Sequence, residues 1–122
     1  MTAARWARWL AVVLFAALIF AGSSIPGDEI NPRFTLHDKI IHATEYAIFA
    51  FLLARAFRQR WWWWAIIVGA LYGVSDEFHQ TFTPRRSGND LGDMTADFVG
   101  SVIGATVSML LQRRRHDGTK SA

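Results

Sequence analysis

Carboxylate and histidine side chains recur at helical spacing in two stretches of the sequence. In the first, Asp38, His42 and Glu45 stand at positions i, i+4 and i+7, so they share one face of a helix. In the second, Asp76 and His79 are three residues apart. A carboxylate–histidine pair on each of two facing helices can hold a metal ion that also binds water. Such a water could attack a phosphoester or an amide. The candidate ligands of the metal are His42, Glu45, Asp76 and His79.

The same residues can also have a structural or proton-transfer role that needs no metal. A hydrogen-bonded, charge-paired network would hold helix ends together, and a chain of ionisable groups inside a membrane could relay protons. We therefore predict no obligatory cofactor and keep a divalent metal as the alternative. Glu77 is a candidate general base if the site is catalytic. The full set of catalytic candidates is Asp38, Lys39, His42, Glu45, Asp76, Glu77 and His79.

A basic loop precedes the last apolar segment. Arg85 and Arg86 stand just before a predicted helix, where guanidinium groups suit a phosphate or a carboxylate. The alternative is that these arginines pair with Asp90, Asp93 or Glu77. The candidate ligand-binding residues are Lys39, Tyr46, Gln80, Arg85, Arg86, Ser87, Asp93 and Asp97.

Composition bounds the class of protein. The 122 residues allow one domain, and the 52% apolar content excludes disorder over most of the length. The absence of cysteine excludes a disulfide framework and a thiolate metal site. The net charge of +3 comes from short basic clusters between apolar runs, which is typical of membrane flanks. A nucleic-acid surface would instead group its cations on one face with free aromatic rings, so we predict no nucleic-acid partner.

Four segments are apolar enough to predict membrane helices. The first and third have no polar face, and a helix that is apolar all round must lie in protein or in lipid. A chain of 122 residues cannot enclose several such helices. Trp6, Trp9 and the run Trp61–Trp64 stand at the ends of these segments, where the headgroup zone favours tryptophan. We therefore predict an all-α, four-helix transmembrane bundle in one domain, 1–122, with helices at about 7–24, 38–57, 61–80 and 90–111 and a frayed polar tail at 112–122.

The distribution of Lys and Arg predicts the orientation. Nine of the thirteen flank the segment ends that include both termini, which are therefore predicted to be cytoplasmic. The polar residues then gather in a pocket on the extracytoplasmic side. An alternative for the first segment is a signal peptide cleaved near Ala21, Gly22 and Ser23, which would leave three spans.

A line of small residues follows one face of the last segment. Ala96, Gly100, Gly104 and Ser108 recur every four residues, a pattern that lets another helix approach closely. The partner can be a helix of the same chain, or a second copy in a homodimer through Gly100 and Gly104.

Three polar motifs resemble those of the VanZ-like family of small bacterial membrane proteins. They are Asp-Lys-Ile-Ile-His at 38–42 with Tyr46 four residues on, Ser-Asp-Glu-Phe-His-Gln at 75–80, and Arg-Arg-Ser-Gly at 85–88 followed by Asp93, Asp97 and Gly100. The resemblance covers about Thr35 to Leu110 and departs from the family pattern at Asp97, where asparagine is expected. It implies an integral protein of the bacterial cytoplasmic membrane. The namesake of the family confers low-level resistance to the glycopeptide teicoplanin.

The leading functional hypothesis is a multi-pass membrane protein whose outer pocket binds an anionic envelope lipid or a lipid-linked cell-wall intermediate. Any resistance would then be indirect. The second hypothesis is a membrane-embedded, metal-assisted hydrolase or transferase acting on a phospholipid. The third is a structural helper of a larger partner. A proton-coupled transporter is a weaker alternative, because four helices make a small pathway without dimerisation.

Overall fold

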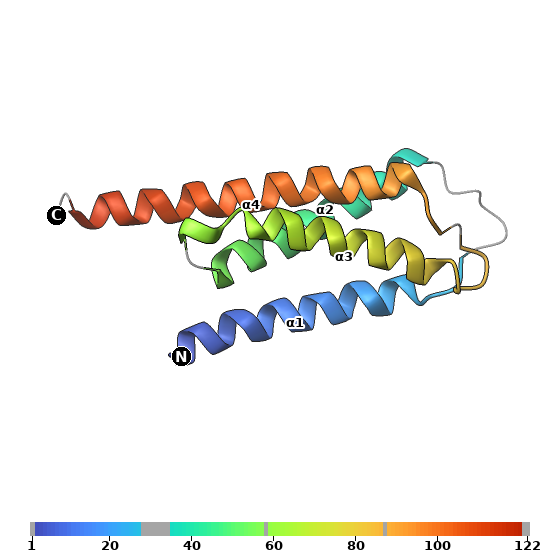
Figure 1. Ribbon diagram of the computed structural model, residues 1–122, viewed down its shortest axis with the longest axis horizontal. Coiled ribbons are helices and arrows are strands. Elements are labelled where there is room, and N and C mark those ends of the chain that lie inside the picture. The colour runs from blue at the N-terminus through green and yellow to red at the C-terminus, as the bar shows by residue number, and fades with distance from the viewer. Residues whose placement is uncertain (1, 28–34, 58, 87, 121–122) are drawn as a thin grey trace.

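The computed structural model describes residues 2–27, 35–57, 59–86 and 88–120, and within them it is entirely helical (Figure 1). These residues form four α-helices and one short 3-10 helix and contain no strand. The prediction of an all-α fold with four helices is therefore confirmed. The elements are α1 (Ala3–Ser23), α2 (Thr35–Ala56), η1 (Gln59–Trp61), α3 (Trp64–Gln80) and α4 (Leu91–Lys120).

The four helices lie side by side along the long axis of the molecule (Figure 1). Both chain ends lie at one end of the bundle, and the end of α1, the start of α2, the end of α3 and the start of α4 lie at the other end (Figure 1). Helices α2 and α4 therefore run parallel. This arrangement gathers the starts of α2 and α4 and the end of α3 at one place, as the sequence predicted for its polar residues.

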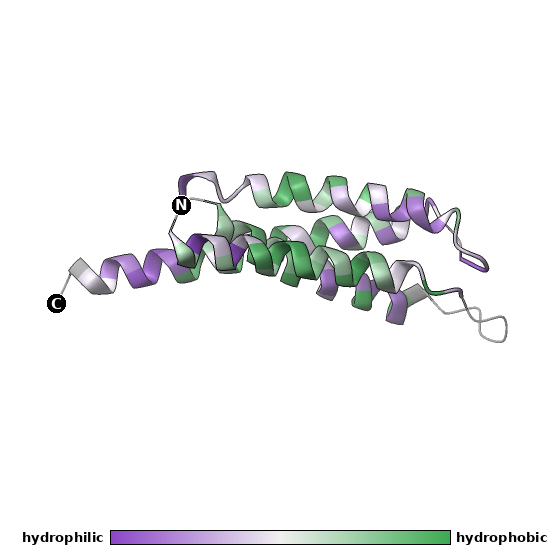
Figure 2. Ribbon diagram, turned by 90° about the horizontal axis from the view of Figure 1, so that it is seen from below, coloured by the Kyte–Doolittle hydropathy of each residue, from purple (hydrophilic) through white to green (hydrophobic). Residues whose placement is uncertain are grey.

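Two helix boundaries differ from the prediction. The third helix begins at Trp64, because residues 59–61 form the separate 3-10 turn η1. Helix α4 continues to Lys120, so the predicted frayed tail is helical through that residue and extends past the other helices (Figure 2). Gln and Arg are good helix formers, and no proline interrupts this part of the chain, so the helix can propagate beyond the apolar segment.

The core lies along α2. Tyr46, Phe49, Ala50 and Leu53 are buried there, and Ala105 of α4 is buried against them. Because Ala50 and Ala105 have small side chains, the backbones of α2 and α4 can approach closely.

The small-residue line of α4 is used within the chain. A Cβ atom at Gly100 would lie 2.1 Å from the Ala43 carbonyl oxygen, and one at Gly104 would lie 1.8 Å from that of Ala47. Only glycine fits at either place, so the two glycines fix the distance and the register between α2 and α4.

Hydrophobic residues predominate along the middle of the helices, and hydrophilic residues gather towards the ends of the bundle (Figure 2). Helix α1 and α4 over Leu91–Thr119 are each long and apolar enough to cross a membrane. Most of α1 is unburied: Leu10, Leu14 and Leu18 are 58%, 57% and 65% exposed. A continuous exposed apolar surface of this kind is typical of contact with lipid or with another protein.

Candidate functional site

An ion pair joins the starts of α2 and α4. Lys39 Nζ lies 2.8 Å from Asp93 Oδ1 and 3.6 Å from Asp90 Oδ1. A Cβ at Gly92 would lie 2.5 Å from Lys39 Nζ, so the glycine leaves the space that the lysine needs. Asp93 is buried, which makes Lys39 its neutralising partner.

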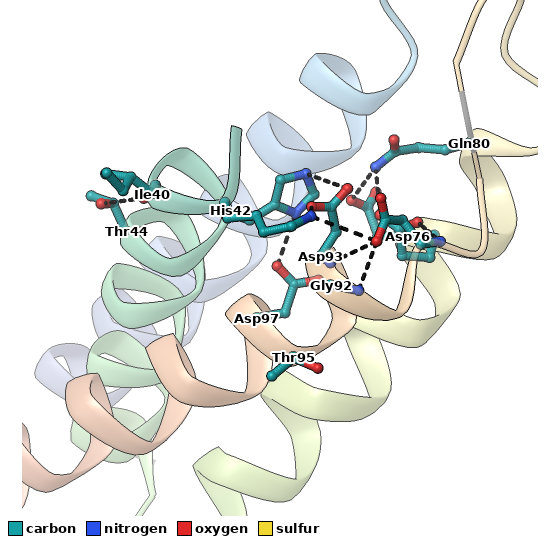
Figure 3. A network of polar contacts seen from close by, with 12 residues as sticks. Ile40, His42, Thr44, Asp76, Gln80, Gly92, Asp93, Thr95 and Asp97 are labelled. Carbon is teal, nitrogen blue, oxygen red and sulfur yellow. Dashed lines mark hydrogen bonds and ion pairs between the residues drawn. The ribbon is translucent and has the colours of Figure 1, made fainter. Parts of the chain in front are cut away.

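A buried histidine–aspartate pair lies one turn deeper. His42 Nδ1 lies 2.9 Å from Asp97 Oδ1, and the two residues are 5% and 0% exposed (Figure 3). An ionised carboxylate only accepts hydrogen bonds, so Nδ1 carries the hydrogen of this bond. The Nε2 atom of His42 lies 3.9 Å from Asp93 Oδ2. Asp97 thus orients the ring while Asp93 joins it to the lysine ion pair.

Helix α3 supplies the opposite wall. Glu77 is fully buried, and its Oε2 accepts the backbone N–H of Asp90 at 2.9 Å. Gln80 Nε2 donates to Asp76 Oδ2 at 3.2 Å and to Glu77 Oε1 at 3.4 Å (Figure 3). Asp76 and Gln80 are also buried, so three helices contribute polar side chains to one network.

Asp90 is the N-cap of α4. Its Oδ1 accepts the backbone N–H groups of Gly92 at 2.7 Å and Asp93 at 3.3 Å, which satisfies two donors of the first turn. Partial burial would by itself raise the pKa of Asp90. The hydrogen bond from Gly92 and the positive charge of Lys39 outweigh burial, so the pKa of Asp90 is lower than its ordinary value.

Arg86 binds the end of α1. Its Nε donates to the Ile25 carbonyl oxygen at 3.0 Å and its Nη2 to that of Gly22 at 3.1 Å, while Nη1 lies 3.4 Å from Gln80 Oε1. The predicted pairing of Arg86 with Asp90, Asp93 or Glu77 is absent from these contacts. The residue instead ties α1 to the network through backbone carbonyls, which no sequence motif marks.

The remaining ligand-binding candidates have different surroundings. Arg85 is exposed and has a left-handed backbone, with φ of 60°. Tyr46 is fully buried, and within the described part of the chain its hydroxyl has no hydrogen-bond partner. Ser87 lies outside the described residues.

His79 lies apart from the network. Its Nε2 is 3.0 Å from Ser24 Oγ, and its ring stacks on Phe20 with centroids 4.4 Å apart. His79 therefore faces α1, although it is only three residues from the buried Asp76. Glu45 is half-buried on α2.

The structure assembles a different metal-ligand geometry from the predicted one. Asp38, His42 and Asp93 each offer one ligand atom, and these atoms all lie within 4.8 Å of one another. Only His42 belongs to both sets. Sequence spacing could relate Asp38 to His42 on one helix, but Asp93 reaches them only through the register between α2 and α4. The small-residue line was the available signal for that register.

Comparison with known proteins identifies a family. The family profile described as VanZ/LLP1 matches residues 5–112, which cover α2, α3, all but the first two residues of α1, and the apolar part of α4. No curated protein and no solved structure matches the sequence. The resemblance of the three polar motifs to the VanZ-like family is confirmed, and the match extends to α1. The chain belongs to the VanZ-like family.

Proposed function

We propose that the chain is a multi-pass protein of the bacterial cytoplasmic membrane, with four spans and both termini in the cytoplasm. The exposed apolar surface of α1 and α4 supports insertion. Most of the described Lys and Arg residues lie near the end of the bundle that holds both termini, and this asymmetry supports the orientation. Helix α1 packs on α3 through a 2.7 Å hydrogen bond from Tyr72 Oη to the Ala16 carbonyl, which supports a retained span rather than a cleaved signal.

We further propose that the polar network binds the phosphate-bearing headgroup of an anionic envelope lipid or lipid-linked cell-wall intermediate. The observation that carries this proposal is the buried His42–Asp97 pair beside the Lys39–Asp93 ion pair. Ionisable groups at membrane depth are costly, so they are expected to serve a ligand. In the orientation proposed above, the site lies at the extracytoplasmic end of the bundle.

The charge of the site requires a cation between the protein and an anionic ligand. Acids outnumber cations in the network, and Arg86 is engaged by carbonyl oxygens. A divalent ion held by Asp38, His42 and Asp93 would offset this charge and bind the phosphate directly. Because Asp93 directs Oδ1 to Lys39 and Oδ2 towards His42, one carboxylate can serve both the lysine and the ion.

One observation favours a second candidate, a metal-assisted hydrolase or transferase acting on a phospholipid. Asp97 holds the far nitrogen of His42, as carboxylates do for histidines that bind catalytic metals. A water on the ion would then be the nucleophile. In either case, an effect on glycopeptide resistance would follow indirectly from altered envelope lipids.

Native mass spectrometry of protein gently released from membranes tests the binding proposal. We expect one divalent metal per chain and a bound anionic lipid. Asp38→Ala removes a candidate ligand without touching the His42–Asp97 bond, so it should lose the metal and most of the lipid. His79→Ala is the matched control, because His79 faces α1 at the same end of the bundle.

Three results would contradict parts of the proposal. A wild-type protein that carries neither metal nor lipid would leave a structural network as the explanation. Equal metal content in Asp38→Ala and His79→Ala would refute the ligand set. Lipid retained without metal would refute the cation bridge. If the protein releases phosphate from a lipid phosphoester and a chelator abolishes this activity, the hydrolase hypothesis is supported over the binding hypothesis.

A further inference from the structure

A basic cavity lies at the opposite end of the bundle from the polar network. It measures about 220 Å³ and is bounded by residues of α1, α2, η1 and α4. Its lining residues are Arg8, Arg55, Gln59, Gln112, Arg115 and His116.

The cavity brings cations together without a compensating acid. None of the described acids lies within salt-bridge distance of Arg8, Arg55 or Arg115. His116 lies 3.9 Å from Asp117, an exposed neighbour on α4 that does not line the cavity. Three guanidinium groups around one space repel one another, and an anion between them would reverse that repulsion.

The framework around these cations is held by contacts that leave donors available. Arg8 Nη1 donates to the Arg55 carbonyl oxygen at 3.3 Å, and the Trp9 ring packs edge-on against Phe57 at 5.3 Å, so α1 is held against the end of α2. Gln112 Nε2 donates to the Ala54 carbonyl at 3.2 Å, which fixes α4 on the same helix. The remaining guanidinium N–H groups have the fork geometry that suits phosphate oxygens.

An apolar groove adjoins the basic cavity. It measures about 210 Å³ and shares Arg8 and Arg55 with the basic cavity, while its other walls are Ala7, Ala11 and Leu52. A ligand that fills both spaces must have an anionic head and an apolar tail. Exposed tryptophans at this end of the bundle, Trp6 at 63% among them, are typical of headgroup depth.

We propose that this cavity is a second ligand site, which binds the phosphate of an anionic phospholipid and lays an acyl chain along the groove between α1 and α2. The site rests on the membrane insertion proposed above but not on any ligand of the polar network. Its residues lie at the other end of the bundle, so either site can fail without the other.

The test compares two double variants of the full chain that remove the same charge from the same end. Arg8→Gln with Arg115→Gln changes the cavity, whereas Arg60→Gln with Arg114→Gln changes arginines outside its lining. Purified protein is titrated with phosphatidylglycerol, and native mass spectrometry measures the lipid retained. We expect the cavity variant to retain lipid at least about tenfold more weakly than the control variant, because each lost contact is a charge-assisted hydrogen bond.

Several outcomes would overturn the proposal. Equal retention by the two double variants would show a diffuse charge effect, and equal retention of phosphatidylcholine would show no selection for an anionic head. Displacement of the lipid by stoichiometric inorganic phosphate would identify free phosphate as the ligand. Far-UV circular dichroism checks the fold, and the single variant Arg115→Gln lies on the exposed part of α4, so it keeps the proposal testable if the double variant unfolds.

Discussion

Replacing Gly104 with alanine should separate α4 from α2. A Cβ at this position would lie 1.8 Å from the Ala47 carbonyl oxygen and 2.6 Å from its carbon, and both belong to the backbone. Real Cβ atoms essentially never approach closer than 3.0 Å, so the helices must move apart by about 1.2 Å. Rotation of a flexible side chain cannot relieve this contact.

The displacement reaches the polar network. The His42–Asp97 bond of 2.9 Å lies two turns away along the same pair of helices. If the helices move as rigid bodies, this distance exceeds the limit for a hydrogen bond. Overpacking costs about 1–3 kcal/mol, and the lost charge-assisted bond costs about 1.5–3 kcal/mol. Alanine regains up to about 1 kcal/mol of helix propensity. The expected loss in the free energy of unfolding is about 2–5 kcal/mol.

Equilibrium unfolding in mixed detergent micelles, followed by tryptophan fluorescence, measures this loss. Gly118→Ala is the control on the same helix, because nothing lies within 4 Å of the added Cβ there. The control should be neutral or slightly more stable than the wild type. If Gly104→Ala and Gly118→Ala unfold at the same detergent composition, the close approach of α2 and α4 does not hold the bundle together.

Two further predictions concern the network itself. Asp97→Asn keeps an oxygen that accepts the His42 Nδ1 hydrogen, so it should cost less than about 1.5 kcal/mol of unfolding free energy. Asp97→Ala leaves a buried histidine without a partner and should cost about 3–5 kcal/mol. Equal losses in the two variants would refute the pairing. Because the pKa of Asp90 is lowered from 3.8, its ionised form stabilises the folded state above that pH, and this contribution disappears as the pH falls through the folded-state pKa. Asp90→Asn should therefore show a smaller stability loss between neutral and acidic pH than the wild type, and an unchanged acid-unfolding profile would contradict the capping role.

The helices and the gathering of polar residues could be predicted from the sequence, because apolar runs and helical spacing are local properties. The end of α4 could not be predicted in this way, because the run of apolar residues stops at Leu111 while the helix continues through residues with good helix propensity. Apolarity marks where a helix must be covered, whereas propensity decides how far it extends.

The partners of individual polar side chains depend on the packing between helices. Asp76 and His79 lie about 60° apart around α3, which is enough for one to face the network and the other to face α1. Arg86 binds backbone carbonyls, which every residue has, so its partners leave no trace in residue types. Asp93 joins the candidate metal ligands because α4 has a particular register on α2.

The parallel course of α2 and α4 also sets the charge that each end presents. Asp38 and Asp93 occupy the first turns of these helices, and Arg55 occupies the last turn of α2, so these charges complement the helix dipoles. The two positive helix starts offset part of the acid excess in the polar network, and the negative end of α2 offsets part of the repulsion among the arginines. The attraction of the network for a cation, and of the basic cavity for a phosphate, is therefore weaker than a count of side chains implies. Selective binding at either end then depends on how the protein atoms are arranged. At one end, three oxygen and nitrogen atoms lie within 4.8 Å of one another, and at the other end guanidinium groups lie beside an apolar groove.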